Sequence, residues 1–148
     1  MYQTLLVPVD GSENARHALA IACKLAIQDR ARVHILHIPE TLSHDTRLIW
    51  GAGSVLMDAP QDEVERAGKK IAEGARQEAT EHGVTDVDVS IQQGDPARVI
   101  LEQANLLGVD AVVMGSRGLS DIAGLVVGSV SHKVSHAADC EVITVHRP

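Results

Sequence analysis

The sequence is poor in aromatic residues and in cysteine. It contains no Phe, one Trp, one Tyr and two Cys among 148 residues. Its 20 acidic residues outnumber its 13 basic ones and leave a net charge of −7. This composition offers neither the basic field nor the stacking rings of a typical nucleic-acid binder. Two cysteines, Cys23 and Cys140, are too few for a disulfide framework. We therefore expect a protein of the reducing cytoplasm that binds no nucleic acid.

A long apolar run is also missing. A membrane-spanning helix needs roughly 18 apolar residues in succession, and no uncharged stretch of the sequence approaches this length. Residues 1–12 carry neither the basic start nor the apolar segment of a secretory signal. We expect no membrane insertion. The 45% hydrophobic and 22% charged residues are typical of a globular protein, with one domain over residues 1–148.

Short apolar runs alternate with segments of helical periodicity. The runs predict strands at 5–9, 33–38, 87–91, 111–114 and 142–145. Apolar residues at helical spacing predict helices over 15–26, 64–79, 96–107 and 129–137. Strands that alternate with helices favour an α/β fold, a parallel sheet covered on both faces. Polar–apolar alternation at 87–91 indicates an edge strand, and the wholly apolar 111–114 an inner one.

The predicted helices carry their own start and stop signals. Asp95 followed by Pro96 is typical of a helix N-terminus. Gly83 and Gly108 are placed to end two helices. The buried face of the helix before Gly83 is predicted to comprise Val64, Ala67, Ile71, Ala75 and Ala79.

Residues 39–59 form a connection too long for an ordinary loop, and they include the single Trp, Trp50. One interpretation is that this segment packs locally over an end of the sheet. The other is that it closes over a ligand as a lid.

Ligands of open parallel sheets bind at the carboxyl ends of the strands, and residues 8–12 follow such an end. The carboxylate of Asp10 could accept a hydrogen bond from a ribose hydroxyl or hold a divalent metal. Alternatively, Asp10 caps the next helix together with Ser12. The residues alone leave both interpretations open.

A second segment after a strand is rich in glycine. Gly115, Gly118 and Gly128-Ser129 give the spacing Gly-x2-Gly-x9-Gly-Ser. Glycine permits close backbone approach, and a helix that begins at Ser129 would present unpaired N–H groups to an anion. Such a loop could hold phosphates without a lysine. It matches neither a Walker A loop nor the dinucleotide fingerprint, and a loop that only reverses the chain is the alternative.

Two further patterns have simpler explanations. His132 and His136 stand at a helical spacing that zinc can use, but no third ligand is near in sequence, so a solvated helix face is favoured. Cys23 fits the apolar face of its helix as a core thiol.

Four segments resemble the universal stress protein family, and the resemblance extends over essentially the whole chain. They are residues 8–12 with the strand before them, the strand at 35–38, Gly94-Asp95-Pro96-Ala97 and the Gly-x2-Gly-x9-Gly-Ser segment. The Gly-x2-Gly-x9-Gly-Ser pattern is typical of its ATP-binding members. The resemblance implies a Rossmann-like three-layer sandwich with five parallel strands in the order 3-2-1-4-5. It also implies ATP with Mg²⁺ in the crevice of the sheet, and a homodimer.

The resemblance further implies roles for individual residues. The first strand would border the adenosine, with Asp10 as its polar contact, and Ile38 would offer backbone contacts to adenine. The last helix and the glycine loop would donate hydrogen bonds to the phosphates. The implied nucleotide-binding residues are Pro8, Val9, Asp10, Ile38, Met114, Gly115, Arg117, Gly118, Gly128, Ser129 and Val130.

These observations favour a cytoplasmic ATP-binding regulatory protein that acts through nucleotide occupancy and an unknown regulatory partner protein. No catalytic base is evident beside the glycine loop, so we expect slow ATP hydrolysis or none. One alternative is an adenylating or nucleotide-hydrolysing enzyme on the same fold, although the Ser-Gly-Gly-x-Asp-Ser loop of such adenylating enzymes is missing. Another is an interaction module whose pocket stays empty.

The final predicted strand, 142–145, is apolar on both faces. In the strand order of the family it lies at the edge of the sheet. Exposed apolar edges favour strand pairing, so we expect a homodimer formed by antiparallel pairing of this C-terminal strand.

Overall fold

The computed structural model describes residues 1–39, 61–117 and 128–146. In chain order these residues form β1 (Thr4–Val9), α1 (Glu13–Asp29), β2 (Arg32–His37), α4 (Gln61–Glu81), β3 (Val87–Ile91), α5 (Pro96–Leu107), β4 (Ala111–Gly115), α6 (Ser129–Ala137) and β5 (Glu141–Val145). Trp50 and nearly all of the predicted 39–59 connection lie outside the described residues.

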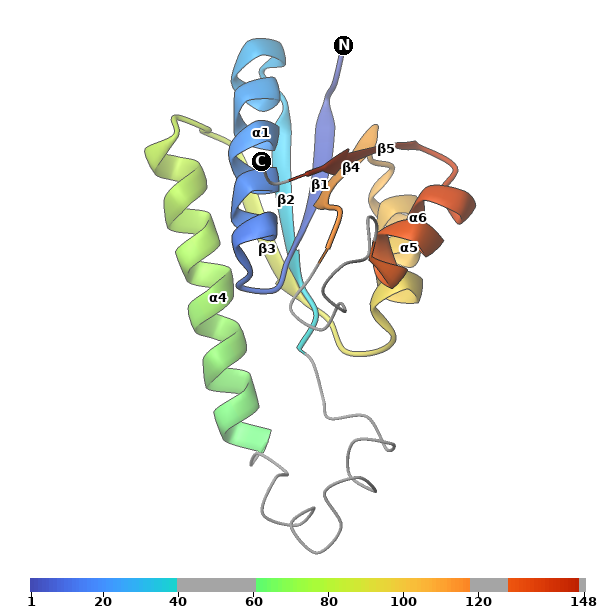
Figure 1. Ribbon diagram of the computed structural model, residues 1–148. Helices are drawn as coiled ribbons and strands as arrows, with labels where there is room; N and C mark the ends of the chain where they lie inside the picture. Colours follow the sequence, from blue (N-terminus) through green and yellow to red (C-terminus); the bar gives the residue numbers. More distant parts are fainter. Residues whose placement is uncertain (40–60, 118–127, 147–148) are drawn as a thin grey trace, which may run out of the picture.

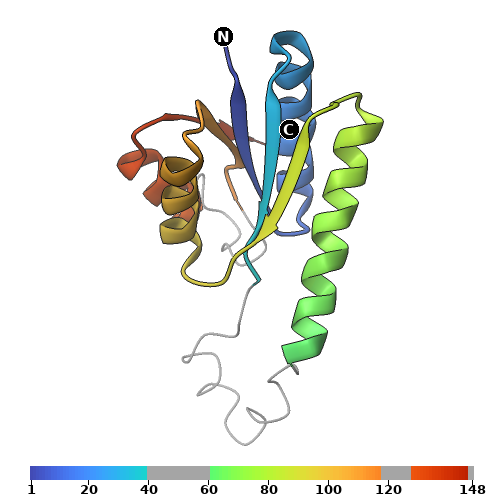
Figure 2. The ribbon, with the colours of Figure 1, turned by 180° about the vertical axis from the view of Figure 1, so that it is seen from behind.

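The strands form one parallel sheet in the order β3-β2-β1-β4-β5. Figures 1 and 2 show α1 and α4 on one face of this sheet and α5 and α6 on the other. The predicted three-layer α/β sandwich and its strand order are therefore confirmed. Among the described helices, none combines the length and the apolar character needed to cross a membrane.

Each face of the sheet has its own hydrophobic core, because side chains alternate along a strand. From β1, Leu5 and Val7 pack toward α1 and α4, whereas Leu6 packs toward α5 and α6. Full burial of such a side chain contributes about 1.5–3 kcal/mol. Val112 and Val113 of β4 are wholly buried, one in each core, so this strand is an inner one, as predicted.

Pro8 interrupts the hydrogen bonding of β1 toward β4. Backbone groups of a strand face its two neighbours alternately, and the Thr4 carbonyl accepts a bond from Asp110 N–H on the β4 side at 2.9 Å. Two and four residues on, Leu6 and Pro8 face the same way, but proline has no N–H to donate. Pairing with β4 accordingly stops at Leu6–Val112, while pairing with β2 continues to Val9–His37. The carboxyl ends of β1 and β4 are thereby free to separate.

The start and end of α5 are as predicted. Asp95 accepts a hydrogen bond from Arg98 N–H at 3.1 Å, and Pro96 opens the helix. Gly108 ends it in the left-handed conformation, with φ of 62°, which glycine adopts without strain.

The predicted buried face of α4 is wrong at Ala67, and it omits the buried Ala72. Ala67 is exposed, and Gly68 is buried against His37 instead. The Nδ1–H group of His37 donates to the Val9 carbonyl at 2.8 Å, which fixes the ring between the sheet and α4. A Cβ atom on Gly68 would stand 3.2 Å from His37 Cδ2. The helix therefore places its smallest residue over the imidazole ring.

The Asp110 carboxylate holds the start of the N-terminal strand. Asp110 Oδ2 accepts hydrogen bonds from the backbone N–H groups of Gln3 at 2.6 Å and Thr4 at 2.9 Å. These two bonds favour the charged form and hold the pKa of Asp110 below its ordinary value.

The two glycines of α4 should respond differently to substitution by alanine. Gly74→Ala should raise the free energy of unfolding by about 0.5–1 kcal/mol, because alanine is the better helix former and nothing lies within 4 Å of the new Cβ atom. Gly68→Ala should lower it, because His37 is held by Val9 and cannot withdraw. Urea unfolding of both variants measures this difference. Equal stabilisation by the two substitutions would contradict it.

The lowered pKa of Asp110 gives stability a defined pH dependence. The contribution of the carboxylate is present above its unfolded-state pKa of about 3.9 and is lost as the pH falls through the lower folded-state value. Asp110→Asn should thus be less stable than wild type at pH 7, with the difference shrinking toward pH 2. Urea midpoints across this range test the prediction, with the exposed Asp139→Asn as a control for lost charge. A difference that does not change with pH would refute it.

Candidate functional site

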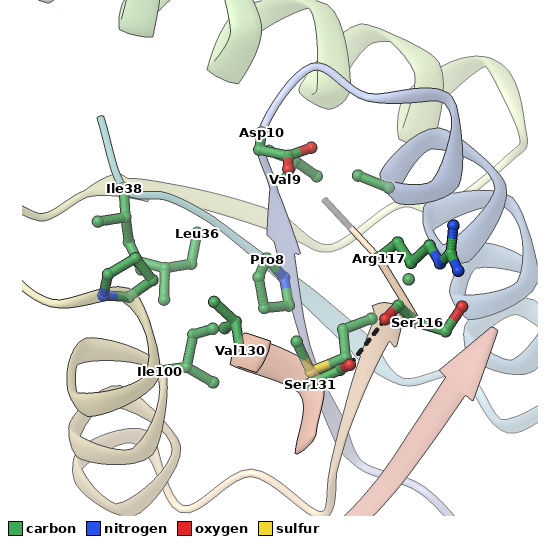
Figure 3. A pocket seen from close by; sticks show the side chains of 14 residues that line it. Pro8, Val9, Asp10, Leu36, Ile38, Ile100, Ser116, Arg117, Val130 and Ser131 are labelled. Atoms are coloured by element: carbon green, nitrogen blue, oxygen red, sulfur yellow. Dashed lines mark hydrogen bonds between the residues drawn. The ribbon is translucent and has the colours of Figure 1, made fainter. Parts of the chain in front are cut away.

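A hollow opens at the carboxyl ends of the strands, where β1 and β4 separate (Figure 3). It encloses about 670 Å³ of empty space, including the part that is open to solvent. Its walls come from β1, β2, β4 and the first turns of α1, α5 and α6. This is the switch point of an open α/β sheet, where ligands of such folds bind.

The two sides of the hollow differ in polarity. Figure 3 shows Leu36, Ile38 and Ile100 gathered on one side, while Ser116 and Arg117 lie on the opposite side. An apolar wall suits a flat heterocycle, and hydroxyl, guanidinium and helix N–H groups suit an anion. The hollow is therefore suited to a ligand with one apolar and one anionic end.

The structure brings most of the predicted site residues together. Those that line the hollow are Pro8, Val9, Asp10, Ile38, Met114, Gly115, Arg117 and Val130. Gly128 and Ser129 lie beside it at the start of α6, although neither lines its wall. Gly118 lies outside the described residues.

Asp10 supports the turn before α1, and the N-cap itself is Ser12. Its Oδ1 atom accepts a hydrogen bond from Ser12 N–H at 2.9 Å, and Ser12 in turn caps α1 through its hydroxyl oxygen. The carboxylate also lines the hollow. Asp10 is therefore fixed by the turn and still placed to contact a ligand.

Gly115 is required by packing rather than by a left-handed backbone. Gly115 does not have a positive φ angle. A Cβ atom added to it would stand 2.9 Å from Asn14 Cβ and 3.0 Å from the Asn14 backbone carbon. Glycine thus lets the end of β4 lie directly against the first turn of α1.

The start of α6 is fastened to the end of β4. Gly128 N–H donates to the carbonyl oxygen of Ser116, and Ser131 Oγ donates to the same oxygen at 2.8 Å. Ser116 N–H donates to the Val145 carbonyl at 2.9 Å. Because the Gly128 N–H group is engaged here, the predicted donation from Gly128 to a phosphate would require this bond to break.

Sequence reasoning missed part of the wall. The additional lining residues are Ala15, Leu36, Pro96, Ile100, Ser116 and Ser131. A signal existed for some of them. Leu36 and Ile38 share one face of β2 because side chains repeat every second residue, and Pro96 and Ile100 share one face of α5 because helical neighbours are four residues apart. The two serines carry no such signal.

Among the described residues that line the hollow there is no His or Cys. Within residues 1–39, 61–117 and 128–146, no cluster of three or more His, Cys, Asp or Glu side chains is arranged to hold a metal ion. His132 and His136 are exposed, with their ring centres 4.4 Å apart. Burial raises the pKa of Cys23 to about 11, which leaves this core thiol unreactive at neutral pH.

Known proteins resemble this chain over its full length. The model of the universal stress protein family matches residues 1–146. Universal stress protein YxiE of Bacillus subtilis is 37% identical over 98% of this chain and 99% of its own. The structure of UspA from Lactobacillus plantarum has a TM-score of 0.80 at 25% identity and covers 97% of both chains. A universal stress protein in complex with cAMP has a TM-score of 0.70 at 27% identity and covers 98% of this chain and 97% of its own. The chain therefore belongs to the universal stress protein family.

Proposed function

We propose that this chain binds ATP with Mg²⁺ in the hollow between β1 and β4. The observation that carries the proposal is the polarity of that hollow, in which an apolar wall faces Ser116 and Arg117 and the N-terminus of α6 contributes to the lining. Adenine would lie against Leu36, Ile38 and Ile100. The phosphates would lie toward Arg117 and the first turn of α6, where backbone N–H groups and the helix dipole favour negative charge.

The ligand of a relative supports an adenine nucleotide. The universal stress protein solved in complex with cAMP is 27% identical to this chain and covers nearly all of it. An adenine nucleotide combines a flat heterocycle with an anionic group, which matches the two sides of the hollow.

Magnesium would have one carboxylate ligand here. Mg²⁺ sites that accompany nucleotides commonly use one or two carboxylates together with phosphate oxygens and water. Asp10 supplies one carboxylate at the wall of the hollow, which fits this pattern. When bound, the metal would neutralise phosphate charge that the acidic chain, with a net charge of −7, does not offset by itself.

The lining residues favour nucleotide binding over hydrolysis. Asp10 and Arg117 are the ionisable residues among the described lining residues, and Asp10 already accepts the Ser12 N–H bond. Phosphoryl transfer needs an oriented nucleophile besides charge neutralisation. We infer a cytoplasmic regulatory protein whose nucleotide occupancy is read by a partner protein, with slow hydrolysis or none.

Calorimetric titration tests this proposal. Nucleotide-stripped wild type should bind ATP with Mg²⁺ at micromolar affinity, roughly 8 kcal/mol of binding free energy. If the glycine loop holds the phosphates, the Gly118→Ala, Gly128→Ala double variant should bind at least about tenfold more weakly, because an added Cβ atom limits how closely a backbone can approach an anion. Gly74→Ala, an exposed glycine of α4, is the matched control and should bind like wild type.

Three results would each contradict a different part of the proposal. A folded wild type that binds no adenine nucleotide would refute nucleotide binding and favour an interaction module. Turnover of about one ATP per second or faster would indicate an enzyme instead of a switch. Release of pyrophosphate in the presence of an acid substrate would indicate an adenylating enzyme.

We also propose that β5 pairs with β5 of a second copy. It is an edge strand of the sheet, and Val142, Ile143 and Thr144 are only half-buried. The Val145 carbonyl faces β4, since it accepts the Ser116 N–H bond. By alternation the backbone groups of Val142 and Thr144 face away from β4, so they are the groups that a second β5 would pair with.

Sedimentation equilibrium should find a homodimer at micromolar concentration. Thr144→Pro removes an outward N–H group without breaking a bond to β4, so it should shift the protein to monomer. Thr144→Val keeps that N–H group and should remain dimeric. A monomeric wild type, or a dimer that survives Thr144→Pro, would disprove pairing through β5.

A further inference from the structure

The first turn of α6 is attached to the sheet through one peptide carbonyl. Ser116, directly after β4, is 3% exposed, and Ser131, in the first turn of α6, is 2% exposed. The Ser131 hydroxyl donates to the Ser116 carbonyl oxygen at 2.8 Å, between residues 15 apart in sequence. The dashed line in Figure 3 marks this bond.

The Ser131 hydroxyl has a second acceptor nearby, at a longer distance. The Gly128 carbonyl, three residues earlier, lies 3.0 Å from Ser131 Oγ. Serines inside helices commonly bond to such a carbonyl of the preceding turn. A hydroxyl has one hydrogen to donate, and the shorter contact is to Ser116. The bond therefore links α6 to β4 instead of serving only the helix.

The backbone of Ser116 joins three elements. Its carbonyl accepts from Ser131 and from Gly128 N–H, and its own N–H donates to Val145 at the end of β5. Without the Ser131 hydroxyl, the carbonyl would keep only the Gly128 N–H group, the N-cap of α6. The start of the helix would then be held by one bond instead of two, and its first turn could shift. The position of the first turn of α6 thus depends on the Ser131 hydroxyl.

Ser131 is bonded to Ser116 on the polar side of the hollow, whereas its neighbour Val130 packs against the apolar wall. Ser116, Ser131 and Val130 all line the hollow at the start of α6. The apolar wall comes from β2, the residue after it, and α5. Val130 and Val134 of α6 pack against the cluster that contains Leu36, Ile38 and Ile100. These three residues are also held by β2 and α5, so a displacement of α6 would move the N–H groups of its first turn more than it would move the apolar wall.

We propose that Ser131 is a positioning residue for the phosphates of the nucleotide. This inference rests on the proposed function, because it concerns the same hollow. The hydroxyl holds the N-terminus of α6 at the distance at which its N–H groups reach the phosphates. It therefore controls affinity for ATP more than affinity for the nucleoside.

A pair of β-branched substitutions isolates the hydroxyl. Thr and Val have nearly the same shape, so Ser131→Thr and Ser131→Val add the same bulk and differ in the hydroxyl alone. ATP with Mg²⁺ and adenosine are titrated separately into each protein, and thermal unfolding confirms that each is folded. Ser131→Ala serves as the second variant without a hydroxyl if Ser131→Val does not fold.

Ser131→Val should weaken ATP binding about tenfold, of the order expected for misplaced charge-assisted hydrogen bonds, with adenosine affinity unchanged within twofold. Ser131→Thr should restore ATP affinity toward wild type. An equal loss for ATP and adenosine would assign Ser131 a general structural role and overturn the inference. Unchanged ATP affinity in Ser131→Val would overturn it while nucleotide binding stands. A wild type that binds no ATP would overturn both.

Discussion

The candidate site depends on a backbone N–H donor that the central strand β1 lacks at Pro8. Pro8 lies in the central strand, where almost any other residue would continue the ladder on both sides. Pairing toward β4 ends at Leu6, whereas pairing toward β2 runs on to Val9. The gap that results lies between strands whose other contacts are intact, so the sheet opens locally without losing its order. Pro8 therefore marks the point where the paired part of the sheet ends and the hollow begins.

The layers on each side then shape the gap. On one side Gly115 lets β4 lie against α1, and on the other the Ser116 carbonyl fastens α6. These contacts are short and specific, so the end of β4 is held from both faces. A ligand would meet a wall that is already formed, which reduces the entropic cost of ordering it.

Periodicity was sufficient to predict the strands, the helices and the ends of α5. It failed at α4, where the interval between buried residues can be three or four positions. Which residue of α4 is buried there depends on the side chain that the helix packs against. The imidazole ring of His37 leaves room only for the glycine at position 68. His37 is 31 residues away in sequence, and no local pattern reveals that contact. The strand order, likewise, came from family resemblance and not from periodicity.

Within the site, residues at strand ends were easier to predict than those that fasten the elements together. Pro8, Asp10 and Met114 follow from the rule that ligands bind at the carboxyl ends of strands. Ser116 and Ser131 do not, because a buried serine and a surface serine look alike in a sequence. What distinguishes them is a bond between residues 15 apart, which exists only after the chain has folded.

The two edges of the sheet are unlike, and this limits how copies could assemble. At the β3 edge, Arg32 forms ion pairs with Asp86 at 3.0 Å and with Asp88 at 3.4 Å, and all three side chains are half-exposed. Charged side chains of this kind oppose strand addition, so a β5 strand would not add to the β3 edge of another copy. Head-to-tail stacking into an open filament is thereby disfavoured. The β5 pairing that we propose would instead be self-complementary about a two-fold axis and complete after two copies.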